Sequence, residues 1–293
     1  MTEDAGAIVA FRAELRQWIA ASWDPDLTVD AWWQRIADAG WAAPSWPARW
    51  GGRDADRRAE SMVIAEFLGA NIPGPPGGVG ITHAAPTILM HGDDKQRERY
   101  LYPTLTGQVG WCQLFSEPEA GSDLAGLQTR AVQDGDEWIV TGQKVWTTLA
   151  HVADYAMLLV RTDPNVPKHQ GISWMVLNMD SIGVEVRPLR QMNGHEEFNE
   201  VFLDEVHVPA ENVVGQVHGG WSVGLTTLAY ERASHQRFAA PGDPGTKSGV
   251  LERRVGDFVA APKAKQAVTE KPRGSRVVPL ARRFERTDDP IVR

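Results

Sequence analysis

Apolar residues recur at steps of three and four along the first hundred residues of the chain. This spacing is the period of an amphipathic helix that buries one face. It predicts four helices, over residues 8–23, 29–39, 56–68 and 94–101. We therefore predict an all-helical N-terminal domain over residues 1–108.

The pattern changes near Gly110, where short β-branched and aromatic runs replace the helical period. Two of these runs flank Asp134 and Gly135, and an Asp-Gly dipeptide between β-prone runs is a strong hairpin signal. Further runs between polar turns predict strands over residues 155–161, 171–180, 183–188 and 200–208. Many short strands of this kind predict a small β-barrel middle domain over residues 109–216.

A helical stretch resumes over residues 221–234, where Gly224 is the only Gly or Pro. We interpret residues 217–236 as the truncated start of a C-terminal helical domain, so the fold class is α+β. Residues 237–293 differ from the rest, because they carry 13 basic and 7 acidic residues, whereas residues 1–236 carry 17 basic and 31 acidic ones. All 12 Trp and all 4 Tyr also precede residue 237. We expect this basic, Pro- and Gly-containing tail to be mostly disordered.

The composition excludes several classes of protein. The 293 residues are 42% hydrophobic and 23% charged, which is ordinary for a globular protein. The acidic body argues against nucleic acid as a partner. No apolar run approaches the roughly 18 residues of a membrane-spanning helix, and the acidic start is unlike a signal peptide, so we expect no membrane association. Cys112 is the one cysteine, which excludes an intramolecular disulfide framework and favours the cytoplasm.

Common catalytic and nucleotide-binding motifs are missing from the sequence. The eight His residues show no metal-ligand spacing, so we predict no metal site. There is no Gly-x-Ser-x-Gly motif, and residues 245–248 lack the first glycine of a P-loop. The glycines of residues 77–80 lie in a helical region, so they do not form a dinucleotide-binding turn.

Two segments carry more specific information: Ser-Glu-Pro-Glu-Ala-Gly-Ser-Asp at residues 116–123 and Gly-Gln-Lys-Val-Trp-Thr-Thr at residues 142–148. Together they resemble the two flavin-contacting segments of the acyl-CoA dehydrogenase family. Supporting matches in the same order are residues 40–52, 198–209 and 230–234. The resemblance covers about residues 8–236, and it implies the same succession of a helical domain, a β domain and a helix.

The resemblance implies FAD as the cofactor. A flavin ring needs an apolar surface to lie against and hydrogen bonds for its polar edge. By resemblance, Trp146 packs against the isoalloxazine ring and Thr148 donates a hydrogen bond near N5, with Thr147 beside it. Ser116 and the backbone of Phe115 would satisfy the pyrimidine edge.

The family removes the α-proton of an acyl-CoA thioester with a carboxylate, while hydride passes from the β-carbon to the flavin. Some members place that carboxylate at the position of Glu231, which is our candidate base, with Arg232 as a substrate contact and Ser122 between cofactor and acyl-CoA. The alternative for Glu231 is a solvated helix residue paired with Arg232 or with a nearby basic group. We interpret Glu117 and Glu119 as turn and capping residues.

The sequence also departs from the family. Residues 192–199 replace its common Arg-x-Ser-x-Thr substrate loop, which argues against ordinary fatty acyl specificity. The resemblance stops near Ser234, so the C-terminal four-helix bundle is expected to be missing. An out-of-frame reading or a gene rearrangement is our hypothesis for the tail, and we expect weak FAD binding in isolation.

These observations leave two main hypotheses. The first is FAD-dependent α,β-dehydrogenation of an acyl-CoA in lipid degradation, impaired by loss of the bundle, with an electron-transfer flavoprotein as a possible acceptor. The second is a catalytically inert remnant or partner subunit that forms a homo- or hetero-oligomer with a full-length homologue. A flavin-dependent oxidase or monooxygenase is a third alternative.

Overall fold

The computed structural model describes residues 2–192, 194–233 and 249–259. Its α-helices are α1 (Thr2–Ser22), α2 (Val29–Asp38), α3 (Arg58–Gly69), α4 (Ala85–His91), α5 (Asp94–Leu105) and α6 (Gly220–Ala233). The four helices predicted for the first hundred residues are therefore confirmed as α1, α2, α3 and α5. No helix of the described residues is both long and apolar enough to cross a membrane.

Local signals explain where these helices begin. Thr28 caps α2 by accepting a hydrogen bond from the backbone N–H of Ala31 at 3.1 Å. A capping box formed by Asp93 and Gln96 starts α5, and it satisfies two N–H groups that the first helical turn leaves without partners. Bulky apolar side chains at this spacing on α2 and α3, such as Trp32 and Phe67, are buried in the helical core.

The helical stretch over residues 80–91 was not predicted from the sequence. It consists of a five-residue π-helix, Gly80–Ala84, which leads directly into α4. A Cβ atom on Gly80 would lie 2.7 Å from the ring of Trp111, so only glycine allows this approach to the first strand. Single π-helical turns occur often at functional sites.

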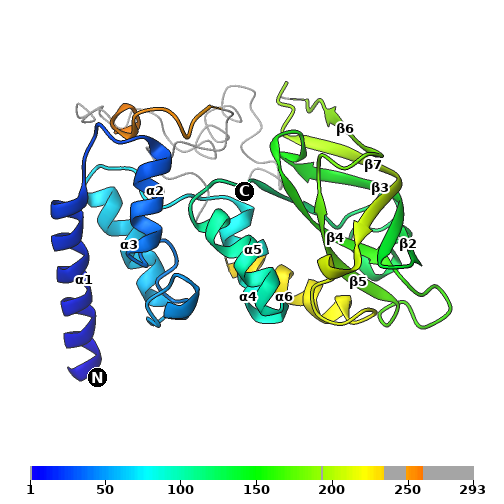
Figure 1. Ribbon diagram of the computed structural model, residues 1–293, viewed down its shortest axis with the longest axis horizontal. Coiled ribbons are helices and arrows are strands. Elements are labelled where there is room, and N and C mark those ends of the chain that lie inside the picture. The colour runs from blue at the N-terminus through cyan, green and yellow to red at the C-terminus, as the bar shows by residue number, and fades with distance from the viewer. Residues whose placement is uncertain (1, 193, 234–248, 260–293) are drawn as a thin grey trace, which may run out of the picture. The chain divides into compact units, whose positions relative to one another are not determined.

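The middle part of the chain forms one curled sheet (Figure 1). Its strands are β1 (Trp111–Leu114), β2 (Arg130–Asp134), β3 (Glu137–Thr148), β4 (Tyr155–Arg161), β5 (Ile172–Asn178), β6 (Val184–Leu189) and β7 (Phe198–Pro209). The hydrogen-bonded order is β1-β4-β2-β3-β7-β6, and β5 pairs with β4. The predicted hairpin is confirmed, because Asp134 pairs with Glu137 across a two-residue turn. The predicted later strands are confirmed as β4 to β7, whereas β1 was not predicted.

Strand β4 lies between two hydrophobic cores. Met157 and Leu159 face the core shared with the helices, while Ala156, Leu158 and Val160 face the core inside the curled sheet. Alternate side chains of a strand point to opposite faces, so a strand covered on both sides is apolar throughout. The fold class predicted from the sequence, α+β with a helical part before a β part, is confirmed.

Helix α6 packs on both the sheet and the earlier helices, beside α4 (Figure 1). A Cβ atom on Gly220 would lie 2.4 Å from the backbone of Ser173 in β5, so the helix begins in contact with the strand. At its middle, the buried hydroxyls of Thr227 and Thr87 are 3.1 Å apart. The helix predicted for residues 221–234 is therefore present and fixed at two points.

Residues 249–259 correct part of the expectation for the tail. Their backbone bonds to the loop before α2, with Val29 N–H donating to Arg253 at 2.8 Å and Val255 N–H donating to Leu27 at 2.8 Å. Val255 is fully buried in the helical core. We call residues 249–259 the return segment. The rest of the predicted disordered tail, residues 237–248 and 260–293, lies outside the described residues.

Candidate functional site

The end of strand β3 is irregular where it carries the predicted flavin residues. The pairing of β3 with β7 shifts between Lys144 and Thr147, so one extra residue is accommodated on β3. Trp146 lies in this bulge with a φ of 62°, which is a rare conformation for a bulky residue. Its indole is 62% exposed, so the strained backbone presents a flat aromatic surface outward.

The second motif segment lies against this bulge. The backbone N–H of Val145 donates to the carbonyl of Ser116 at 2.9 Å. The ammonium of Lys144 donates to the carbonyl of Phe115 at 3.2 Å. The structure therefore brings Phe115 and Ser116 next to Trp146, although about 30 residues separate them in the sequence.

A buried ion pair lies beneath this contact. Lys144 Nζ is 2.8 Å from Glu117 Oε1, and the side chains are 0% and 6% exposed. Glu117 also accepts the backbone N–H groups of Gln128 at 2.6 Å and Thr129 at 2.9 Å. Glu117 is indeed in a turn, paired with Ala120, but its carboxylate also forms an ion pair that was not predicted.

Burial and pairing act against each other on these two groups. Burial lowers the pKa of Lys144 to about 8, although Glu117 opposes the shift. Burial would raise the pKa of Glu117, but Lys144 and the backbone N–H groups outweigh it and lower that pKa overall. Both groups are therefore charged at neutral pH.

The predicted hydroxyl groups do not all face the same way. Thr148 and Ser122 are exposed, and Ser116 is half-buried. Thr147 is buried, and its Oγ1 has no hydrogen-bond partner in the described part of the chain. Phe115 is also buried, so only its backbone can meet a ligand. An exposed indole beside Thr148 and Ser116 fits the requirements of a flavin ring, an apolar surface with nearby hydrogen-bonding groups.

The candidate base Glu231 points toward the sheet. Gln113 Nε2 of β1 donates to Glu231 Oε2 at 3.0 Å. Glu231 is half-buried on α6, whereas the neighbouring Arg232 is exposed. The structure thus joins Glu231 to the strand that runs into Phe115 and Ser116. Ser122 and Arg232 are both exposed, and no hydrogen bond among the described residues joins Ser122 to this group.

The π-helix adds a histidine to the surroundings of Glu231. His83 is 2% exposed. Burial lowers the pKa of His83 below its ordinary value, and the negative charge of Glu231 opposes that shift. The two side chains therefore lie close enough for their charges to interact.

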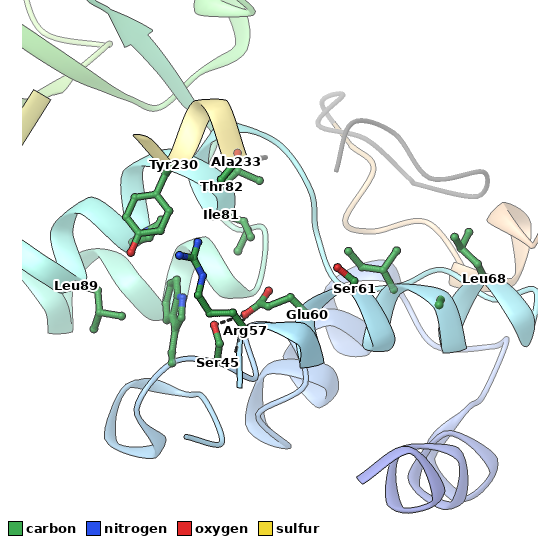
Figure 2. A pocket seen from close by; sticks show the side chains of 14 residues that line it. Ser45, Arg57, Glu60, Ser61, Leu68, Ile81, Thr82, Leu89, Tyr230 and Ala233 are labelled. Atoms are coloured by element: carbon green, nitrogen blue, oxygen red, sulfur yellow. Dashed lines mark hydrogen bonds between the residues drawn. The ribbon is translucent and has the colours of Figure 1, made fainter. Parts of the chain in front are cut away.

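A pocket of about 500 Å³ opens between α3, the π-helix with α4, and the end of α6 (Figure 2). Arg57 lies over the ring of Tyr230 at 5.6 Å, and Ser45 Oγ donates to Glu60 at 2.5 Å. None of the predicted site residues lines it. Since Tyr230 lines the pocket while Glu231 contacts β1, the pocket is on another side of α6 from the candidate base.

Sequence reasoning missed Lys144, Gln113 and His83. A lysine inside a β-prone run was a signal, because a buried cation needs an acidic partner. Nothing local identifies that partner, which is 27 positions away. Nothing in the sequence near Gln113 or His83 marks them as site residues, because each is linked to the site only through Glu231 of α6.

Two protein-family models match this chain, one over its helical N-terminal part and one over its curled sheet. The model of the acyl-CoA dehydrogenase N-terminal domain matches residues 7–108, and that of the middle domain matches residues 112–206. The chain is 48% identical to the acyl-CoA dehydrogenase FadE34 of Mycobacterium tuberculosis over 209 residues. That match covers 71% of this chain and 29% of FadE34, so the chain spans less than a third of this relative.

Solved structures are also similar to this chain over most of its length. The Tcur3481-Tcur3483 steroid ACAD is similar with a TM-score of 0.61 and 27% identity, covering 97% of this chain and 69% of that chain. The ChsE4-ChsE5 complex from Mycobacterium tuberculosis is similar with a TM-score of 0.61 and 32% identity, covering 80% of this chain and 61% of that chain.

Proposed function

Since this chain belongs to the acyl-CoA dehydrogenase family, we propose that it binds FAD at the end of β3 and oxidises an acyl-CoA thioester to the enoyl-CoA. Family membership supports acyl-CoA dehydrogenation in general. The roles that follow for individual residues are part of the proposal.

The hydrogen bond between Gln113 and Glu231 carries this proposal. It brings a carboxylate from α6 to β1, three residues before Ser116. Strand β1 ends at Leu114, and three residues of chain span at most roughly 11 Å, so Gln113 and Ser116 lie within that distance of each other. An acyl thioester lying between Glu231 and the ring surface of Trp146 would meet a base on one side and a redox cofactor on the other.

Glu231 is the group that takes the proton from the α-carbon of the thioester. Its half-buried position on α6 lets the carboxylate reach a substrate while part of it is shielded from solvent. Gln113 holds the acceptor Oε2 in one orientation. When bound, FAD would supply the acceptor for the hydride that leaves the β-carbon.

The remaining predicted residues are proposed to bind and orient. Trp146 gives the ring an apolar face, and Thr148 and Ser116 donate hydrogen bonds to its polar edge. Ser122 and Arg232 contact the acyl-CoA. Thr147 contributes through its backbone, because its side chain is buried and cannot reach a ligand.

Replacing Glu231 tests the proposal. The purified chain is loaded with FAD and mixed anaerobically with straight-chain, branched and steroid-side-chain acyl-CoAs, and flavin bleaching is followed. We expect E231Q to keep FAD and to lose at least a hundredfold in bleaching rate, the size usual for a general base. E211Q is the matched control, because Glu211 is 71% exposed. Equal bleaching by E231Q would contradict the assignment.

A second candidate function is that of a partner subunit. Trp146, Leu149 and Val152 are 62%, 38% and 41% exposed around the proposed ring site, and such apolar groups favour cover by another chain. The similar ChsE4-ChsE5 structure is a complex of two proteins. In this case the chain alone would not bleach, and activity would appear only on mixing with a full-length homologue. An electron-transfer flavoprotein is the proposed acceptor in both cases.

We place the reaction in the cytoplasm. Cys112 is a buried free thiol, and the sequence has no second cysteine with which it could form an internal disulfide. A chain without disulfides is typical of a reducing compartment.

A further inference from the structure

Two lysine–carboxylate ion pairs have the same N–O distance but differ sharply in how far they are buried. Lys168 and Asp123 are 2.8 Å apart, with side chains 49% and 65% exposed. Lys144 and Glu117 are also 2.8 Å apart but almost fully buried. An exposed pair contributes little, whereas a buried pair must recover the loss of hydration of two charges through its contacts.

The contacts of the buried pair join three segments of the sheet. Lys144 belongs to β3 and bonds to the carbonyl of Phe115 at the end of β1. Glu117 takes the backbone N–H groups of Gln128 and Thr129, just before β2. The negative charge of Glu117 also acts on Arg161 of β4. Burial lowers the pKa of Arg161, and Glu117 opposes that shift. The pair therefore fixes the Phe115–Glu117 segment from beneath.

This fixing decides which groups of the segment face outward. The carbonyl of Phe115 is held by Lys144, and that of Ser116 is held by Val145. In the described part of the chain the Ser116 hydroxyl has no hydrogen-bond partner, so it can bind a ligand. Without Lys144, the Phe115 peptide could rotate and carry Ser116 away from Trp146.

We propose that Lys144 and Glu117 are positioning residues for the flavin edge, which hold Phe115 and Ser116 in register with Trp146 without touching the ring. This inference rests on the proposed binding of FAD. On this inference the pair keeps the groups of the site in position, and it contributes little to the stability of the sheet.

A double substitution separates these two roles. K144M leaves Glu117 buried without its cation, so it should lower both stability and FAD affinity. K144M/E117Q removes both charges and leaves an amide oxygen that can accept the Gln128 or Thr129 N–H. Replacing both members of a buried pair is often neutral for stability. We expect K144M/E117Q to unfold near the wild-type midpoint and to bind FAD at least tenfold more weakly.

Hydrogen exchange in the FAD-free protein provides a second readout. We expect faster exchange in K144M/E117Q for peptides covering residues 111–118 and 143–149, with no change in β5. K168M is the matched control, because it makes the same Lys→Met change in an exposed pair, and it should alter neither FAD affinity nor exchange.

The outcomes distinguish this inference from the proposed function. Wild-type FAD binding with unchanged affinity in K144M/E117Q overturns the positioning role alone. Unchanged exchange in residues 111–118 overturns it as well, whether or not FAD binds. If the wild-type protein, tested as the full 293-residue chain, does not bind FAD, the proposed function itself is overturned.

Discussion

Gln113 of β1 and Glu231 of α6 are 118 positions apart in the chain, yet 3.0 Å separates the amide nitrogen of one from the carboxylate of the other. The contact therefore fixes the orientation of the carboxylate that we propose as the base.

Gln113→Leu should lower kcat/KM about tenfold, because the proposed base loses the donor that orients its carboxylate, and a misplaced catalytic group slows the reaction. Gln133→Leu, a change of the same kind at an exposed position of β2, should leave kcat/KM unchanged. An unchanged kcat/KM in Gln113→Leu would show that the contact does not orient Glu231.

Thr227→Val should lower the free energy of unfolding by about 1 kcal/mol, the usual net value of a buried hydrogen bond. The lost partner is the hydroxyl of Thr87, 3.1 Å away on α4. Urea unfolding of Thr87→Val, Thr227→Val and the double variant forms a cycle that isolates the pair. Strict additivity of the two single effects would mean that the hydroxyls do not interact.

Val255→Ala should lower the free energy of unfolding by about 1–2 kcal/mol, because it deletes two buried methyl groups. Val255 is fully buried, whereas Val132 on β2 is 58% exposed, so Val132→Ala is the matched control. Equal effects of the two changes would mean that the return segment does not stay docked in solution.

Two buried groups should give the stability a pH dependence in opposite directions. Burial raises the pKa of Cys112 far above the value of about 8.5 expected in the unfolded chain. Above pH 8.5 the unfolded chain therefore loses a thiol proton that the folded chain keeps, and stability falls by up to about 1.4 kcal/mol per pH unit. Lys144 has a folded pKa of about 8, against roughly 10.4 unfolded. Here the unfolded chain keeps the proton, so stability rises over the same window.

The two contributions should nearly cancel in the wild-type chain between pH 8.5 and 10. Urea unfolding across this range should show stability rising with pH in Cys112→Ala and falling in Lys144→Met. Tyr100, whose pKa burial raises to about 12, limits the useful range to pH 10 and below. A falling curve in Cys112→Ala would show that Lys144 does not release its proton in this window.

Much of the fold could be predicted because its signals are local. The turn at Gly135 and the helical and strand periods each depend on a few neighbouring residues. The π-helix, the short α4 that follows it, and β1 were missed. Gly80 and Trp111 are explained only by their close approach to each other in the fold. The return segment was missed for the same reason, since Val255 finds its core in a helical domain more than 200 residues earlier.

The site was predictable only as far as motif resemblance extends. The contacts of Ser116 with the Trp146 bulge agree with the resemblance, but the roles of these residues stay predictions. The resemblance did not single out Lys144 or Gln113. Their partners are Glu117 and Glu231, and long-range pairing of this kind depends on the packed fold and not on spacing.

The pairing of β3 with β7 contains two irregularities that compensate each other. The shift between Val140 and Gly142 adds a residue to β7, where Glu205 has a φ of 49°, and the shift at Trp146 adds one to β3. The alignment lost at the first is recovered at the second, so Thr148 again pairs with Phe198. A shift of one residue in the pairing turns the side chains of a strand to the opposite face of the sheet, so a one-residue deletion in either strand would invert the Trp146–Thr148 end of β3. This pair of strands should tolerate changes of residue type far better than changes of length.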